Sequence, residues 1–209
     1  MCCISIAPSE QAISLRMGAI VVNLREKHSF FNYPMYSTLE DALAGIEIPE
    51  EIRNNLALIS VPYLSFEGET REGQLVLHRD LADEVLAIFR ELTELQFPIA
   101  KIVPIAAYGW DDEASMQDNN TAAFNYRFIY GTNDLSNHSL GRAIDVNPLL
   151  NPYIARDGTV HPNGANYDPS LPGTFTLDSA ATKAFLARGW EWGATWEDRM
   201  DWQHFQKLP

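Results

Sequence analysis

Cysteine is nearly absent from this 209-residue sequence, which has only two, at positions 2 and 3. Adjacent cysteines at one end of a chain cannot bridge distant parts of a fold in the usual disulfide geometry. The core is therefore expected to hold together without disulfides, and cysteine content gives no argument for an oxidising compartment. No function is indicated for Cys2 or Cys3.

Positive charge and long apolar runs are also scarce. Fifteen Lys and Arg residues stand against 28 Asp and Glu, which gives a formal net charge of -13. Such an acidic chain is a poor partner for polyanions, so nucleic acid and anionic membrane surfaces are disfavoured. No stretch approaches the roughly 18 to 20 apolar residues of a membrane-spanning helix. Residues 1–16 also lack the basic and apolar regions of a signal peptide.

The composition is that of a folded protein, with 46% hydrophobic and 11% aromatic residues. A chain of this length is expected to form one domain with elaborations rather than two independent domains. Helix signals dominate the first half, and loops and short strands dominate from about residue 98 onward. We therefore predict an N-terminal elaboration, residues 1–96, that packs on the core without folding independently, and a core of residues 97–209.

Helices are predicted at four places: 37–44, a first turn at 49–51, 81–97 and 177–188. The third is the strongest, because hydrophobic residues recur at helical spacing from the expected N-cap Asp80 until Pro98 ends the pattern. Ser37 is the expected N-cap of the first helix. Gly189 is expected to end the last one.

Strands are predicted where apolar and β-branched residues gather between turn residues. The expected strands are 58–66, 74–77, 101–108, 126–131, 143–146 and 202–207. An irregular surface segment is the alternative for the first two. Between residues 148 and 173 proline and glycine are frequent, which predicts a long loop. Loops of that length in compact domains are often functional.

Two short segments carry the clearest chemistry. In the first, SNHSLGRAID at 136–145, His138 precedes a tight glycine turn and a short strand. Because side chains alternate along a strand, Ala143 and Asp145 share one face, so an imidazole and a carboxylate are aimed at one point. The small Ala143 leaves space there. Ser136 is placed either to fix this loop or to hydrogen-bond a ligand.

The second segment, DWQHFQ at 201–206, sets Asp201 three residues before His204. Two neutral imidazoles and one carboxylate form a ligand set of catalytic zinc sites, in which three protein ligands leave one position for water. The remaining carboxylate would be free to take a proton from that water. The alternative is that Asp145 and His204 only satisfy buried hydrogen bonds. The two residues lie far apart in the sequence, so their spacing alone does not bring them together.

The chain resembles a zinc peptidase family that includes bacterial D-alanyl-D-alanine carboxypeptidases, vancomycin-resistance D,D-peptidases and phage L-alanyl-D-glutamate endolysins. The resemblance extends over about 97–206 and rests on Ser136-x-His138-x-x-Gly141-x-Ala143-x-Asp145, Trp192-Gly193-x-x-Trp196 and Asp201-x-x-His204-Phe205. The first motif is specific and the last is shorter. The resemblance implies an α+β fold of the Hedgehog/DD-peptidase type, with a central antiparallel sheet flanked by helices and here an N-terminal helical elaboration.

The resemblance also implies roles for individual residues. His138, Asp145 and His204 would be the ligands of Zn2+. Asp201 would be the catalytic acid/base, where many members have Glu and the endolysin-like branch has Asp. Arg127 falls where the family has an arginine ahead of the first motif, and it would donate to the substrate carbonyl oxygen as that oxygen becomes an oxyanion. The alternative for Arg127 is a pairing with a surface carboxylate.

Other candidates are less specific. Tyr153 and Tyr167, in the proline-rich loop, are candidates for binding the substrate by covering it. His161 could line the same cleft, but a solvated loop histidine is the preferred interpretation. Glu191 could compete with Asp201 as the base. Asp201 is preferred because it lies closer in sequence to a proposed ligand.

The sequence therefore predicts a zinc-dependent peptidase acting on the stem peptides of bacterial peptidoglycan. The leading candidate is a D-alanyl-D-alanine carboxypeptidase. An L-alanyl-D-glutamate endopeptidase, a wall-lytic enzyme, is the alternative with the same chemistry. A non-catalytic, zinc-containing cell-wall binding module is the alternative from another class, but such a module needs neither Asp201 nor Arg127. We expect a monomer that acts in the cell envelope, either periplasmic or at the cell wall.

Overall fold

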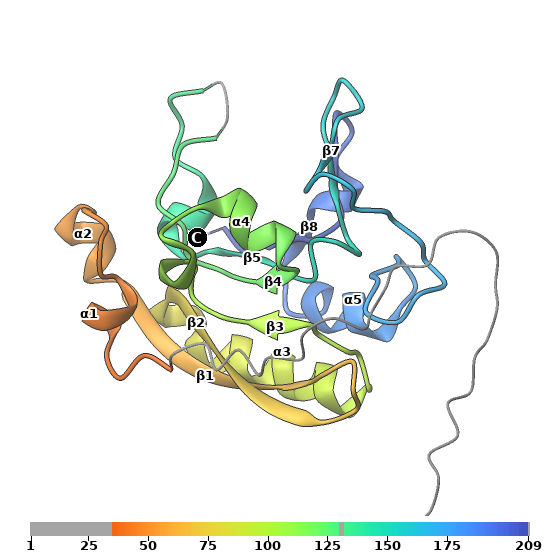
Figure 1. The fold of residues 1–209 in the computed structure, drawn as a ribbon, viewed down its shortest axis with the longest axis horizontal. Helices are drawn as coiled ribbons and strands as arrows, with labels where there is room; N and C mark the ends of the chain where they lie inside the picture. Colours follow the sequence, from red (N-terminus) through yellow and green to blue (C-terminus); the bar gives the residue numbers. More distant parts are fainter. Residues whose placement is uncertain (1–34, 130–131, 209) are drawn as a thin grey trace, which may run out of the picture. The chain divides into compact units, whose positions relative to one another are not determined.

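The computed structural model describes residues 35–129 and 132–208, which combine helices and strands in an α+β arrangement (Figure 1). Cys2, Cys3 and the rest of the N-terminal segment lie outside the described residues. Among the helices that are described, none is long and apolar enough to cross a membrane.

A long hairpin and one helix form the first half of this structure. β1 (Leu56–Leu64) pairs antiparallel with β2 (Thr70–His78) from Leu56↔His78 to Leu64↔Thr70, so both predicted strands are confirmed. β1 begins and ends two residues earlier than predicted, and β2 extends beyond its predicted range at both ends. α3 (Ala82–Glu94) packs against β1. It buries the side chains whose helical spacing predicted it, namely Val85, Ile88, Phe89 and Leu92.

The predicted N-caps of two helices are wrong. Asp80 lies inside a 3-10 turn, η1 (Arg79–Leu81), and its backbone N–H donates to the ring of His78, so the α-helix starts only after this turn. In α1 (Leu39–Ala42) the capping oxygen belongs to Thr38, which accepts from the backbone N–H of Asp41. A further short helix, α2 (Glu50–Arg53), is present where a first turn at 49–51 was predicted, but Pro49 is its N-cap rather than part of its first turn.

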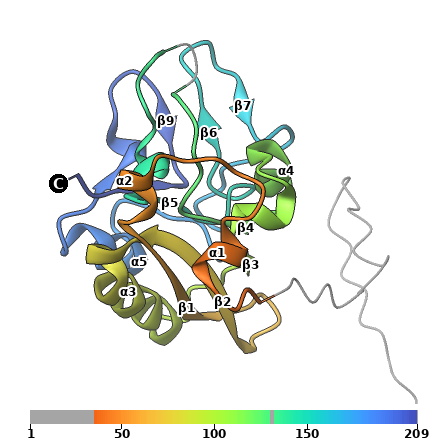
Figure 2. The same cartoon turned by 90° about the vertical axis from the view of Figure 1, so that its left-hand side faces the viewer.

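The described residues form several small sheets instead of the single central sheet that was expected. Besides β1–β2, the sheets have the orders β5–β10–β8, β3–β4 and β7–β6–β9. Their strands are β3 (Lys101–Ile102), β4 (Asn120–Thr121), β5 (Ala143–Asp145), β6 (Tyr153–Ile154), β7 (Val160–His161), β8 (Glu191–Trp192), β9 (Met200–Asp201) and β10 (His204–Gln206). Figure 2 shows β6, β7 and β9 at the opposite end of the described structure from β1 and α3.

Two predicted strands are wrong in whole or in part. Only the first residues of 101–108 are a strand, because Pro104 has no N–H for a ladder and opens a 3-10 helix, η2 (Ile105–Tyr108). Residues 126–129 form only an isolated bridge, Phe128↔Leu135. The N–H of Arg127 donates to the Ser139 hydroxyl rather than to a neighbouring strand.

Near the C-terminus, α5 (Ala180–Leu186) is the core of the predicted last helix, and Gly189 follows it with a φ of +78°, a conformation that glycine adopts without strain. The strand predicted at 143–146 is present as β5, and the strand predicted at 202–207 is present only over its middle residues, as β10.

The main hydrophobic core orients the strands that carry the candidate site. Phe205 is fully buried and stacks on Phe185 with 4.0 Å between ring centroids, and Ile144 is fully buried in the same cluster. Because neighbours in a strand point to opposite faces, Asp145, His204 and Gln206 face away from this core. Apolar residues from both sides of the proposed boundary at residue 97 share the core, and the division into elaboration and core stays a prediction.

Candidate metal centre

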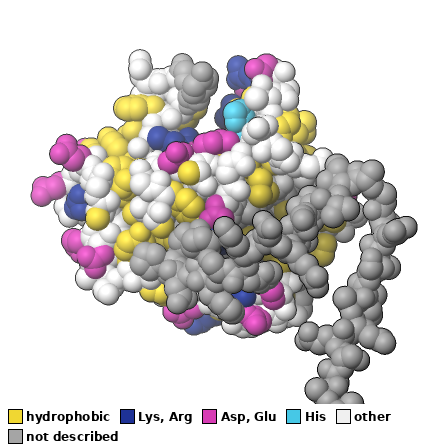
Figure 3. Space-filling model, in the orientation of Figure 1, with side chains coloured by type: hydrophobic (Ala, Val, Ile, Leu, Met, Phe, Trp, Pro, Cys, Tyr) yellow, Lys and Arg dark blue, Asp and Glu magenta, His cyan; other side chains and the backbone are white. Residues whose placement is uncertain are grey.

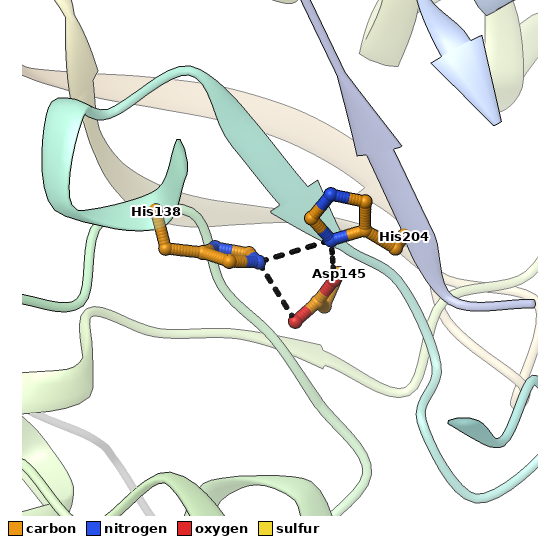
Figure 4. Close-up of side chains that lie close together, drawn as sticks. All are labelled: His138, Asp145 and His204. Carbon is orange, nitrogen blue, oxygen red and sulfur yellow. Dashed lines mark hydrogen bonds and ion pairs between the residues drawn. The ribbon is translucent and has the colours of Figure 1, made fainter. Parts of the chain in front are cut away.

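Two histidines and one aspartate meet at a single point (Figure 4). His138 Nε2 lies 3.1 Å from an Asp145 oxygen, His204 Nδ1 lies 3.0 Å from the other, and the two ring nitrogens are 3.1 Å apart. All three side chains are almost inaccessible to solvent. The structure therefore brings together the three residues that were predicted as metal ligands.

Strand pairing places two members of this cluster. β5 and β10 are antiparallel, and their register sets His204 directly opposite Asp145. Cross-strand neighbours have Cβ atoms about 4.5–5.5 Å apart, close enough for short side chains to touch. Trp196 packs against His204, with 5.2 Å between ring centroids.

His138 comes from the 3-10 helix η3 (Asn137–Leu140) just before β5. Ser136 is its N-cap, and the Ser136 hydroxyl accepts from the backbone N–H of His138 at 3.3 Å. Gly141 ends the turn with a φ of +65°, and a Cβ there would lie 2.4 Å from the backbone N of His78. Glycine is thus required both by the conformation and by the close approach of β2.

Hydrogen bonds on the outer side of the cluster fix which ring nitrogens face inward. His138 Nδ1 lies 2.5 Å from the carbonyl oxygen of Ala123, which can only accept, so the proton is assigned to Nδ1 and the lone pair to Nε2. His204 Nε2 lies 3.1 Å from Gln206 Oε1, another acceptor, so its Nδ1 has the inward lone pair. Metal-binding histidines in proteins are oriented by this kind of partner.

The donor set fits a zinc ion. Two ring lone pairs and a carboxylate converge at 3.0–3.1 Å, and they would repel one another without a cation between them. Zinc bonds of about 2.0–2.1 Å in a tetrahedron place ligand atoms about 3.3 Å apart, close to these separations. His138, His204 and Asp145 could therefore hold zinc and leave a position for water.

Without a metal, a proton takes the place of the cation. Burial alone would lower the pKa of His204, but the hydrogen bond and charge of Asp145 outweigh it and raise this pKa to about 8. Burial likewise favours the neutral form of Asp145, whereas His138 and His204 hold the pKa of this carboxyl far below its usual range. Both shifts show that the cluster stabilises positive charge at its centre.

Asp201 supplies a second carboxylate near the cluster. Its Oδ1 is buried and has no hydrogen-bond partner, and burial raises its pKa to about 6. Gly193, in the 3-10 turn η4 (Gly193–Thr195), allows this arrangement, because a Cβ there would lie 2.8 Å from the Asp201 Cβ and 3.3 Å from the His204 Cβ. With its raised pKa, the Asp201 carboxylate can accept a proton near neutral pH.

Arg127 is held by a carboxylate on a neighbouring helix. Its Nε lies 3.1 Å from Asp112 Oδ2, and the other oxygen of Asp112, in α4 (Asp112–Gln117), accepts from the Asn125 amide at 3.0 Å. The guanidinium is only about one-third exposed and contributes to the electrostatic environment of Asp201. The arginine thus has both a carboxylate partner and a position near the cluster, and its role toward substrate stays a prediction.

The two tyrosines predicted to cover a substrate lie in different surroundings. Tyr153 is opposite Asp201 in the β6–β9 pair and packs against His161, with 6.0 Å between ring centroids. Tyr167 donates from its hydroxyl to the Phe175 carbonyl and stacks on Trp202 at 3.7 Å. Tyr153 is therefore the better placed of the two for contact with a ligand at the cluster.

Two residues around the site were not predicted to act there, namely Gln206 and Asp112. Gln206 is two residues after His204 in β10, so the alternation of side chains could have placed it on the same face. The position of Asp112 beside Arg127 depends on the packing of α4 and had no sequence signal.

The fold and the cluster together define a candidate hydrolytic metal centre with a neighbouring carboxylate. A family model described as D-alanyl-D-alanine carboxypeptidase matches residues 130–207, less than half of the chain but including the cluster and Asp201. The match supports a peptidase of this family without pointing to a particular member, and it implies a peptide substrate. No curated protein and no solved structure matches the chain.

Proposed function

We propose that the protein is a zinc-dependent peptidase that hydrolyses peptide bonds in peptidoglycan stem peptides. The observation that supports this most is the convergence of His138 Nε2, His204 Nδ1 and the Asp145 carboxylate, with both rings oriented from behind. Asp201 adds a second carboxylate with one buried oxygen that has no hydrogen-bond partner, and a purely structural metal site does not need such a group. The match to the carboxypeptidase family supports the same substrate class.

Zinc bound by these residues would polarise the scissile carbonyl and lower the pKa of a water molecule. Asp201, with its pKa raised to about 6 by burial, takes the proton of the attacking water and later gives it to the leaving amine. Arg127 donates from its guanidinium to the carbonyl oxygen as negative charge develops there, while Asp112 holds its Nε side. Trp196 packs against the ring of His204.

The first candidate reaction is removal of the terminal D-alanine by a D-alanyl-D-alanine carboxypeptidase, and the alternative is cleavage between L-alanine and D-glutamate. The two reactions differ in whether the site must accept peptide on both sides of the scissile bond. Figure 3 shows Lys or Arg and Asp or Glu side chains lying close together on one face of the molecule.

Defined muropeptides separate these possibilities. The zinc-loaded protein is incubated with a pentapeptide muropeptide, and product masses are read by mass spectrometry, with Asp201→Asn as the matched inactive control. Loss of one terminal alanine supports the carboxypeptidase, and release of the peptide without its L-alanine supports the endopeptidase. Absence of any product, with zinc bound and muropeptide retained, would contradict the peptidase and favour the non-catalytic binding module.

The remaining expectations follow from this function. A peptidoglycan substrate would be met in the cell envelope, in the periplasm or at the cell wall, and the protein is proposed to act there as a monomer. Tyr153 is the proposed substrate contact beside Asp201, with Ser136 and Tyr167 supporting the loops around it.

A further inference from the structure

A chain of side-chain hydrogen bonds runs from the candidate metal ligand His204 to the surface. His204 Nε2 lies 3.1 Å from Gln206 Oε1, and Gln206 Nε2 donates to Glu191 Oε2 at 2.9 Å. Asn137 Nδ2 also donates to Gln206 Oε1, at 2.7 Å. Gln206 is buried, whereas Glu191 is exposed, so the chain links the buried cluster to an outer carboxylate.

The direction of every hydrogen bond in this chain is set at its outer end. A carboxylate accepts hydrogen bonds and does not donate them, so Glu191 requires the NH2 group of Gln206 to point toward it. The Gln206 carbonyl oxygen must then face His204, and the Asn137 amide reinforces this orientation by donating to the same oxygen. An oxygen in that place can only accept, which requires a proton on His204 Nε2.

We infer that Gln206, oriented by Glu191 and Asn137, is a positioning residue that fixes the Nε2–H tautomer of His204 and directs its Nδ1 toward the metal. This inference rests on the proposed zinc site. The backbone of Gln206 already pairs with Ala143 and Glu191 on either side, so strand pairing does not require this side chain. The burial of its amide on the face of His204 is therefore explained by the metal ligand rather than by the sheet.

The same chain of hydrogen bonds gives Glu191 a role other than that of a base. Its Oε2 is engaged by Gln206 and is separated from His204 by the whole glutamine side chain. Asp201 has a buried oxygen without a partner, which suits proton transfer better. Glu191 instead acts through Gln206 on the orientation of the ring.

The experiment compares zinc affinity, by competition with a chromophoric chelator, in the wild type and two variants. Gln206→Met keeps the length of the side chain and removes its acceptor, so zinc should bind about 10- to 100-fold more weakly, the usual effect of losing such a partner. The double exchange, Gln206→Glu with Glu191→Gln, restores an acceptor for His204 at position 206. The new amide at position 191 then donates to the carboxylate at position 206. Affinity should then return to within about threefold of the wild type.

Two controls separate positioning from loss of structure. Gln117→Met changes a glutamine in α4 whose amide donates to the Asn163 carbonyl, and it should leave zinc affinity unchanged. The His204 Nε2–H signal in NMR spectra of the zinc-loaded protein should exchange with water faster in Gln206→Met than in the wild type or the exchanged pair.

Equal zinc affinity in the wild type and Gln206→Met would overturn the inference while leaving the zinc site intact. If Gln206→Met does not fold, the exchanged pair decides, since a loss of 10-fold or more in that variant would also overturn it. A wild type that binds no zinc would contradict the proposed function itself, and the inference with it.

Discussion

Asp145 and His204 are 59 residues apart in the sequence, yet they are direct cross-strand neighbours and their side chains meet at 3.0 Å. The contact joins the two motifs on which the candidate metal centre depends. Ile144 and Phe205, on the opposite faces of the same two strands, are fully buried, so the core that stabilises the strand pair also fixes the register of the site.

The first prediction concerns metal content. The purified protein should bind about one zinc ion, and His138→Ala should lose it, because two protein ligands hold zinc far more weakly than three. Metal analysis after dialysis checks this. His161→Ala, a change at a partly exposed histidine that lies 3.9 Å from Glu113, is the matched control and should keep its zinc. Equal zinc in wild type and His138→Ala would refute the ligand assignment.

Zinc binding should depend on pH through His204. Since the pKa of this histidine is raised to about 8, the metal must displace its proton at any lower pH. The apparent affinity should therefore rise about tenfold per pH unit between about pH 6.5 and 8 and level off above that. Calorimetry in buffers of different ionisation enthalpy measures the protons released. An affinity that stays constant across this range would be inconsistent with a protonated His204 in the metal-free site.

Asp201→Asn separates the base from the ligands. The variant keeps the shape of the side chain and loses the proton acceptor, so zinc should remain while turnover falls by roughly 10²- to 10⁴-fold. Metal analysis and steady-state kinetics on the same preparation test both parts. Near-normal turnover with bound zinc would transfer the role of base to another residue.

The same variant should be more stable than the metal-free wild type at neutral pH. The pKa of Asp201 is 3.8 for the free group and about 6 when folded, so the folded state binds the extra proton and wild-type stability falls as pH rises between these values. Asn carries no such charge, and its advantage should reach about 1 to 3 kcal/mol above pH 6. Urea unfolding at pH 4 and pH 7 measures the difference. An advantage equally large at pH 4 would rule out the buried charge as its cause.

Arg127 should act mainly on kcat. An interaction that strengthens as the oxyanion forms lowers the barrier without tightening substrate binding, so Arg127→Ala should lose roughly 10²-fold in kcat. Arg127→Lys should also lose activity, because the planar fork is gone. Asp112→Asn, which removes only the partner of its Nε, should have a smaller effect. A raised KM with unchanged kcat would instead make Arg127 a substrate anchor.

Local signals in the sequence determined much of the local structure and the chemistry of the candidate site. A run of β-branched and aromatic residues predicted β1, alternation predicted β2 and β5, and helical spacing predicted α3, all from the side chains along one backbone element. The residue types of His138, Asp145 and His204 already indicated a zinc ligand set. These inferences need only neighbours in the chain, which is why the sequence could provide them.

Only the tertiary structure decided which of these residues meet. The register of β5 and β10, the separation of the expected central sheet into small sheets, and the pairing of Arg127 with Asp112 all depend on contacts between distant segments. The hydrogen bonds that link His204, Gln206 and Glu191 also depend on distant segments, since they need β8, β10 and η3 in place at once. Local propensity is weak beside the packing of a core, so such long-range choices are set by burial and hydrogen bonding in the folded chain.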